Sequence, residues 1–182
     1  MQKLNILWVR EDFRTEDNPA LLSIEKDTEK FEVFYAYNSK NFESRSAQRW
    51  WLYKSLIKFQ EKLSDKGIVF KIFNTDILTV IKELIKKNNI NQFYFNKRYE
   101  PKEQAIETEV ENYLNKNSIK VKKYSGNLLQ NPFDVKKKDG TPFQVFTPYW
   151  RNAEEQYLKN FNFSKKFLIL SLKKLITIIK KF

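Results

Sequence analysis

Residues 4–37 read LNILWVREDFRTEDNPALLSIEKDTEKFEVFYAY, and this stretch decides the fold class. Its first six residues form an apolar run rich in β-forming residues, and a second such run follows at 31–37. Asn18 and Pro19 between the two runs are typical of a helix start, which predicts a short helix over 19–26. A strand, a helix and another strand in this order indicate a βαβ unit, whose two strands run parallel.

The same alternation continues along the chain and predicts three further strands and three further helices. The strands are predicted at 68–73, 92–95 and 119–124, and the helices at 46–65, after a cap at Asp76, and at 101–115. Such alternation favours crossover connections and a parallel sheet. The prediction is a three-layer, Rossmann-like α/β domain with a five-stranded parallel sheet in the order 3-2-1-4-5. A long loop over 125–149 and a helix from Pro148 to Leu158 follow.

The composition excludes several classes of site. The chain has 182 residues, no Cys and no His, which excludes disulfides, Cys/His zinc sites, a thiol nucleophile and an imidazole base. The three glycines, Gly67, Gly126 and Gly140, are too far apart for a P-loop or a GxGxxG motif. No metal site is therefore expected.

The net charge of +12 has two explanations. It reflects either a general bias toward lysine in the composition or an anionic partner such as nucleic acid. Residues 164–182 carry six lysines and no acid, and they are expected to form a connector rather than a membrane-surface helix. The N-terminus does not resemble a signal peptide, and the apolar runs are too short to span a membrane, so a cytoplasmic location is expected.

Charged residues follow two of the predicted strands at the point where the order of the sheet reverses. Ligands of open parallel sheets bind at the carboxyl ends of the strands at this point, and arginine suits planar, bidentate recognition. The candidate binding residues after strands 1 and 4 are Arg10, Asp12, Arg14, Arg98, Glu100 and Glu103. The alternative interpretation is an ion-pair network that closes this end of the sheet, and such a network can also frame a pocket.

Trp50 and Trp51 are adjacent on the predicted helix 46–65, so both cannot face the core. Trp51 shares the apolar stripe with Leu56 and Phe59, which predicts that it points inward. Trp50 is then expected on a partly buried flank of the helix.

Four segments, in this order, resemble the DNA photolyase/cryptochrome family. They are Trp8–Leu21 (WVREDFRTEDNPAL), Ser46–Leu56 (SAQRWWLYKSL), Asn96–Pro101 (NKRYEP) and Gly140–Trp150 (GTPFQVFTPYW). The resemblance implies that residues 1–160 are the family's N-terminal α/β domain, which binds a light-harvesting antenna chromophore in many members. Residues 161–182 would then be the basic connector that leads toward the family's FAD-binding helical domain.

The resemblance also implies an activity for the whole architecture. The family is a group of flavoprotein lyases that repair UV-induced pyrimidine dimers in DNA, using light and reduced FAD. The FAD-contacting and lesion-contacting residues belong to the helical domain, so the 182-residue chain is expected to be inactive alone, as a fragment or a split subunit. FAD binding is expected only where a helical domain, for example a separately encoded partner, is supplied.

The family's antennae are FMN, a deazaflavin or a folate, and the resemblance leaves the choice between them open. By motif position, Asp12, Arg14 and Glu100 would line a flavin-type cleft. Glu103 matches a carboxylate that binds the folate pterin, whereas Lys102 stands where folate-binding members carry asparagine. A carboxylate suits the paired N–H groups of a pterin.

Two alternatives come from other functional classes. One is a stand-alone nucleotide- or flavin-binding α/β module that acts as an adaptor or sensor. The other is a basic nucleic-acid-binding domain that uses residues 164–182. Separately, the segment 125–150 is rich in apolar residues, of which some are expected to pack on the sheet and the rest to be exposed and to favour self-association or a helical partner. They are Phe133, Phe143, Val145, Phe146, Tyr149 and Trp150.

Overall fold

The computed structural model describes residues 3–38, 46–128 and 130–160. The chain separates into two compact units, Met1–Leu128 and Leu129–Phe182. The domain boundaries expected from the sequence stay a prediction, because 161–182 lies outside the described residues. In the described ranges, no helix is both long enough and apolar enough to cross a bilayer.

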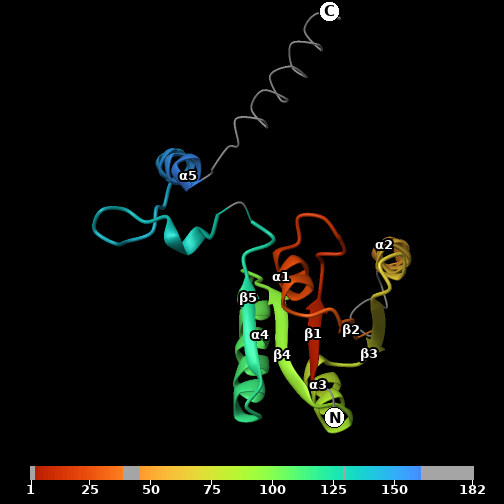
Figure 1. The fold of residues 1–182 in the computed structure, drawn as a ribbon. Coiled ribbons are helices and arrows are strands. Elements are labelled where there is room, and N and C mark those ends of the chain that lie inside the picture. The colour runs from red at the N-terminus through yellow and green to blue at the C-terminus, as the bar shows by residue number, and fades with distance from the viewer. Residues whose placement is uncertain (1–2, 39–45, 129, 161–182) are drawn as a thin grey trace, which may run out of the picture. The chain divides into compact units, whose positions relative to one another are not determined.

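The first unit is built on a parallel sheet with the strand order β3-β2-β1-β4-β5 (Figure 1). All four neighbouring pairs of strands run parallel, so the predicted sheet and its order are confirmed. The strands are β1 (Leu4–Val9), β2 (Phe31–Tyr37), β3 (Val69–Asn74), β4 (Ile90–Asn96) and β5 (Lys120–Tyr124).

Four helices connect these strands, and their ends follow from local capping. They are α1 (Pro19–Asp27), α2 (Ser46–Ser64), α3 (Ile77–Lys87) and α4 (Pro101–Lys116). The side chains of Asn18 and Asp76 accept backbone N–H groups at the first turns of α1 and α3. Gly67, with φ +71°, takes the left-handed conformation that turns the chain from α2 into β3.

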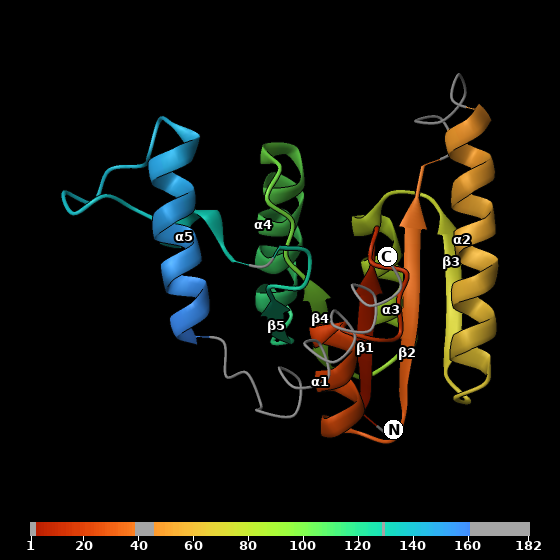
Figure 2. The ribbon, with the colours of Figure 1, turned by 90° about the horizontal axis from the view of Figure 1, so that it is seen from above.

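The helices pack in two layers, one on each face of the sheet (Figure 2). On one face, Leu21 of α1 and Phe59 of α2 pack with Leu7 of β1 and its neighbours. On the other face, Ile81 of α3 and Leu114 of α4 pack with the strand side chains that point to that side of the sheet. Two buried faces explain why the central strand β1 is apolar and buried along nearly its whole length, whereas the edge strand β5 (KVKKY) carries three lysines.

The second unit contains a short 3-10 helix at Pro132–Asp134, an antiparallel bridge between Lys136 and Pro142, and α5 (Phe146–Asn160). The predicted last helix is therefore present, although it begins two residues before Pro148 and ends two residues after Leu158.

Four of the six apolar residues noted in this segment are exposed. Phe133, Val145, Phe146 and Trp150 are 46–72% exposed. Phe143 instead packs edge-on against Tyr149, with ring centroids 6.4 Å apart.

Candidate functional site

Arg10 lies at the centre of a charged network at the carboxyl ends of β1 and β4. Its Nη1 is 3.4 Å from Glu103 Oε2, and its Nη2 is 2.6 Å from Glu107 Oε1. Nη2 also donates to the backbone carbonyl of Asn96, and the guanidinium carbon is 4.4 Å from the centroid of the Trp8 ring. Because Arg10 is only 8% exposed, these contacts fix the start of the loop that follows β1.

Asp12 uses both of its carboxylate oxygens inside the protein. Its Oδ1 accepts the backbone N–H of Arg10 at 2.8 Å, and its Oδ2 accepts the side-chain amide of Asn96 at 2.6 Å. The same amide nitrogen donates to Oδ1 of Asn18, the residue that caps α1, at 2.8 Å. Asp12 therefore joins the ends of two strands to the first helix.

Arg98 connects the loops that follow the two strands. Its Nη1 is 2.6 Å from Glu11 Oε2, and it binds Glu100 through both Nη2 (2.8 Å) and Nε (3.2 Å). The hydrogen bonds from Arg98 lower the pKa of the Glu100 carboxyl to about 2. The backbone N–H of Arg98 donates to Glu107 Oε1 at 2.6 Å, and through Glu107 it is linked to Arg10.

Arg14 lies beside this network and makes a different kind of contact. Its Nε donates to the backbone carbonyl of Asp17 at 2.9 Å, and its Nη2 donates to that of Gly126. Because carbonyl oxygens carry no net charge, these hydrogen bonds leave the positive charge of the Arg14 guanidinium uncompensated. Arg14 therefore contributes positive charge to the space that it faces.

The six residues predicted for the site are brought together by the fold. Arg10, Asp12, Arg98, Glu100 and Glu103 bind one another or shared partners, in agreement with the ion-pair interpretation. We call this set, with Glu11, Asn96 and Glu107, the charged network. A direct role for these residues in chromophore binding stays a prediction.

A cleft of about 1020 Å³ lies next to the charged network. It is bounded by the loop after β1, by Tyr35 near the end of β2, and by α2 from Ala47 to Lys62. Of the six predicted residues, Arg14 lines this cleft and the other five do not. We call it the α2 cleft.

The inner wall of the α2 cleft is aromatic. Phe13 meets Tyr35 edge-on, with ring centroids 5.1 Å apart, and its centroid is 5.8 Å from that of Phe59. Tyr35 in turn stacks on Tyr37 at an angle of 5°. Burial, with a smaller contribution from the charge of Glu11, raises the pKa of Tyr35 to about 12, so this wall is uncharged near neutral pH.

The prediction that Trp51 points into the core is wrong. Trp51 is 70% exposed and Trp50 is 59% exposed, and both line the α2 cleft. The reason is that α2 packs on the sheet from Leu52, in its second turn, and has its first fully buried residue at Leu56, in its third turn. Trp51 precedes these residues on the apolar stripe and faces the cleft.

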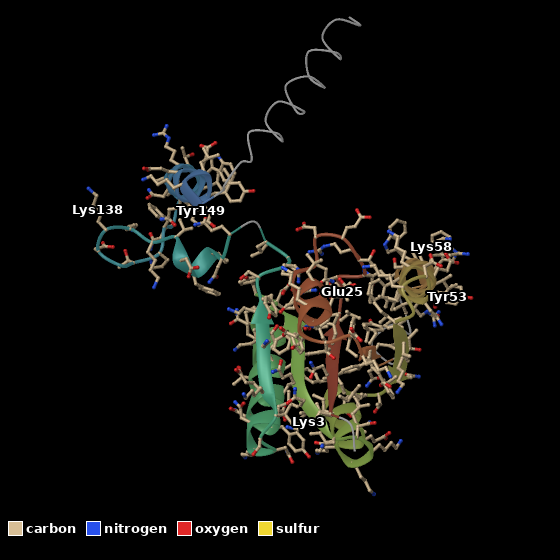
Figure 3. All side chains as sticks on the ribbon, in the orientation of Figure 1. Lys3, Glu25, Tyr53, Lys58, Lys138 and Tyr149 are labelled. Atoms are coloured by element: carbon tan, nitrogen blue, oxygen red, sulfur yellow. The ribbon has the colours of Figure 1, made fainter. Side chains whose placement is uncertain are left out.

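The side of the cleft formed by α2 is basic. Lys54, Lys58 and Lys62 recur at four-residue intervals and all line the cleft, and we call them the lysine row. Lys54 Nζ is 5.9 Å from the Trp50 ring centroid, a distance that permits a cation–π interaction. Figure 3 shows the side chains around α2, with Lys58 and the neighbouring Tyr53 labelled.

Sequence reasoning missed the α2 cleft, although one signal for it was present. Lysines four residues apart, in register with Trp51, define a single face of the helix. Lysine is common throughout this chain, so that signal is weak. In the described ranges, no cluster of acidic side chains is arranged to hold a metal ion.

Comparison with known proteins identifies similar chains. The family model for DNA photolyase matches residues 5–169. A deoxyribodipyrimidine photo-lyase of Agrobacterium fabrum is 30% identical over 149 residues, which are 82% of this chain and 31% of that protein. Cryptochrome-2 of Arabidopsis thaliana is 29% identical over 163 residues, which are 88% of this chain and 27% of that protein.

A solved structure agrees with the sequence comparison. The bacterial class III photolyase from Agrobacterium tumefaciens superimposes with a TM-score of 0.73 at 29% identity, over 85% of this chain and 32% of that one. The chain thus spans about a third of the length of the relatives it matches.

Proposed function

Since the chain belongs to the DNA photolyase family, we propose that its first unit is an antenna domain that binds a light-harvesting pigment in the α2 cleft. The family resemblance supplies the class of pigment, which is FMN, a deazaflavin or a folate. Each of these is a planar, conjugated ring system with polar edges. When bound, such a pigment absorbs near-ultraviolet or blue light and passes the excitation to an acceptor.

The observation that carries the proposal is the lining of the cleft. Its volume of about 1020 Å³ is at the upper end of the range of small-molecule sites, which is roughly 300–1,000 Å³. Phe13 and Tyr35 offer a wall of packed rings, and Trp51 offers an exposed indole face. An aromatic wall suits the face of a planar ring, and the polar side chains that also line the cleft suit its edges.

The residues around the cleft would have distinct roles. Trp51 would stack on the pigment, and Phe13 with Tyr35 would exclude water from one side of it. Arg14 would supply a cation near the ring edge or tail. The buried Arg10 and Asp12 would act as positioning residues, since they hold the loop that carries Phe13 and Arg14.

Binding can be measured with the 182-residue chain by titration with FMN, a deazaflavin and a folate. At least one pigment is expected to bind, and Trp51→Ala should weaken that binding about tenfold, since one aromatic stacking contact contributes about 1–3 kcal/mol. Tyr53→Ala is the matched control, because Tyr53 is on the same helix and is 60% exposed but does not line the cleft. Failure of all three pigments to bind, or equal losses in both variants, would contradict the proposal.

We propose light-driven repair of pyrimidine dimers only for the α/β domain together with an FAD-binding helical domain, on the same or another polypeptide. The chain alone should show no turnover of a dimer-containing oligonucleotide under blue light with FAD and a reductant. Turnover by the chain alone would place a catalytic flavin site within these 182 residues and would contradict this division of roles.

A further inference from the structure

We infer that the lysine row selects a pigment with a negatively charged tail over the same ring without one. This inference rests on the proposed pigment site, which it extends from the ring to the tail. It assigns Lys54, Lys58 and Lys62 as specificity-determining residues. The ligand class is a conjugated ring that carries a phosphate or a chain of carboxylates.

The spacing of the lysine row makes it a continuous cationic strip. Residues four apart on a helix lie on the same side, about 6 Å apart along the axis. Lys54, Lys58 and Lys62 therefore extend the basic wall about 12 Å along the cleft, starting next to the indole of Trp51. A ring stacked on Trp51 would leave its tail free to follow this strip.

The balance of charges in the cleft supports an anionic tail. Among the described residues that line the cleft, the three lysines and Arg14 are cations and Glu11 is the acid. Glu11 shares Arg98 with Glu100, so its charge is compensated in part, and the four cations outnumber this single acid. Arg14 donates to carbonyl oxygens and keeps its charge. The cleft is therefore positive before any ligand enters.

One lysine of the row has an acidic partner on the helix surface. Lys58 Nζ is 2.6 Å from Glu61 Oε2, but the two side chains are 76% and 54% exposed. Exposed pairs of this kind contribute at most about 1 kcal/mol, so Lys58 can exchange Glu61 for a ligand at small cost. Lys54 and Lys62 make no salt bridge with any described acid.

The test compares pairs of pigments that share a ring and differ in the charge of the tail. The pairs are riboflavin with FMN, and a folate monoglutamate with its triglutamate. In each pair whose ring binds, the more charged member is expected to bind about tenfold tighter at low salt, because two or three exposed ion pairs add up to this ratio. The preference should shrink at 0.5 M salt.

Variants assign the effect to the lysine row. The double variant Lys58→Gln/Lys62→Gln should remove most of the preference and leave the affinity for riboflavin, whose tail carries no charge, unchanged. Arg49→Gln is the matched control, because it removes a cation from the same helix outside the cleft and should leave the preference intact.

The outcomes separate this inference from the proposed function. Equal binding of both members of a pair, or an equal loss in the Arg49→Gln control, would overturn the role of the lysine row while the pigment site stands. Failure of every ring to bind would overturn both. A preference that survives the double lysine variant would assign the tail to other residues and refute the inference.

Discussion

Replacement of Glu107 by leucine should lower the free energy of unfolding by about 3–5 kcal/mol. Glu107 and Arg10 form a pair at 2.6 Å in which the side chains are 10% and 9% exposed. Removal of one member of a buried pair leaves the other charge uncompensated, and this accounts for the size of the loss. Glu103, at 3.4 Å from Arg10, compensates it only in part.

A second contact contributes to the same loss. Glu107 Oε1 also accepts the backbone N–H of Arg98 at 2.6 Å, and leucine offers no acceptor in its place. Since small domains unfold with only about 5–15 kcal/mol, this loss is a substantial fraction of the total stability. The free energy of unfolding falls by about 2 kcal/mol for each molar of urea, so the midpoint of urea unfolding should fall by roughly 2 M.

Urea unfolding of the 182-residue chain, followed by circular dichroism, measures this loss. The double variant Arg10→Met/Glu107→Leu should recover the part of the loss that comes from the uncompensated charge, because apolar replacement of a whole buried pair is close to neutral. Glu61→Gln is the control for an exposed pair and should cost less than about 1 kcal/mol. A loss below 1 kcal/mol for Glu107→Leu, or a double variant no more stable than the single one, would refute the argument.

Two further predictions concern the same end of the sheet. In Gly126→Ala the new Cβ would lie 2.6 Å from Cγ and Oδ1 of Asn96, so the charged network must shift at a cost of about 1–3 kcal/mol in urea unfolding. An unchanged midpoint would show that Asn96 moves freely. Because the pKa of Tyr35 is raised to about 12 from an unfolded value near 10, its contribution to stability is complete below pH 10 and is lost between pH 10 and 12. The free energy of unfolding of Tyr35→Phe should therefore fall by about 2 kcal/mol less than that of the parent between pH 10 and 12. Parallel curves of unfolding free energy against pH would contradict this role of Tyr35.

Much of the fold could be predicted because its determinants are local. The apolar runs of β1 and β2 and the caps at Asn18 and Asp76 identify elements without reference to the rest of the chain. The alternation of parallel strands with helices then allows only a few strand orders in the sheet. A proline favours the first turn of a helix and predicts a start at Pro148, whereas α5 begins two residues earlier, at Phe146.

The site was predictable in part. The charges after β1 and β4 meet because the carboxyl ends of neighbouring parallel strands lie at one edge of the sheet. The orientation of Trp51 was not predictable from helical periodicity, which identifies a stripe of residues but does not show how far along that stripe the sheet extends. In the structure α2 packs on the core from Leu52 onward, and Trp51 before it forms part of the wall of a cleft.

The central position of β1 has a consequence for the order in which the protein can form. β1 is the first strand to be synthesised, yet it pairs with β4 as well as with β2. About 80 residues separate Val9 from Ile90, so at 5–20 residues per second one edge of β1 waits roughly 4–16 s for its partner. During translation the nascent chain therefore carries an apolar strand with an open edge, and the sheet closes only when the second half of the domain has left the ribosome.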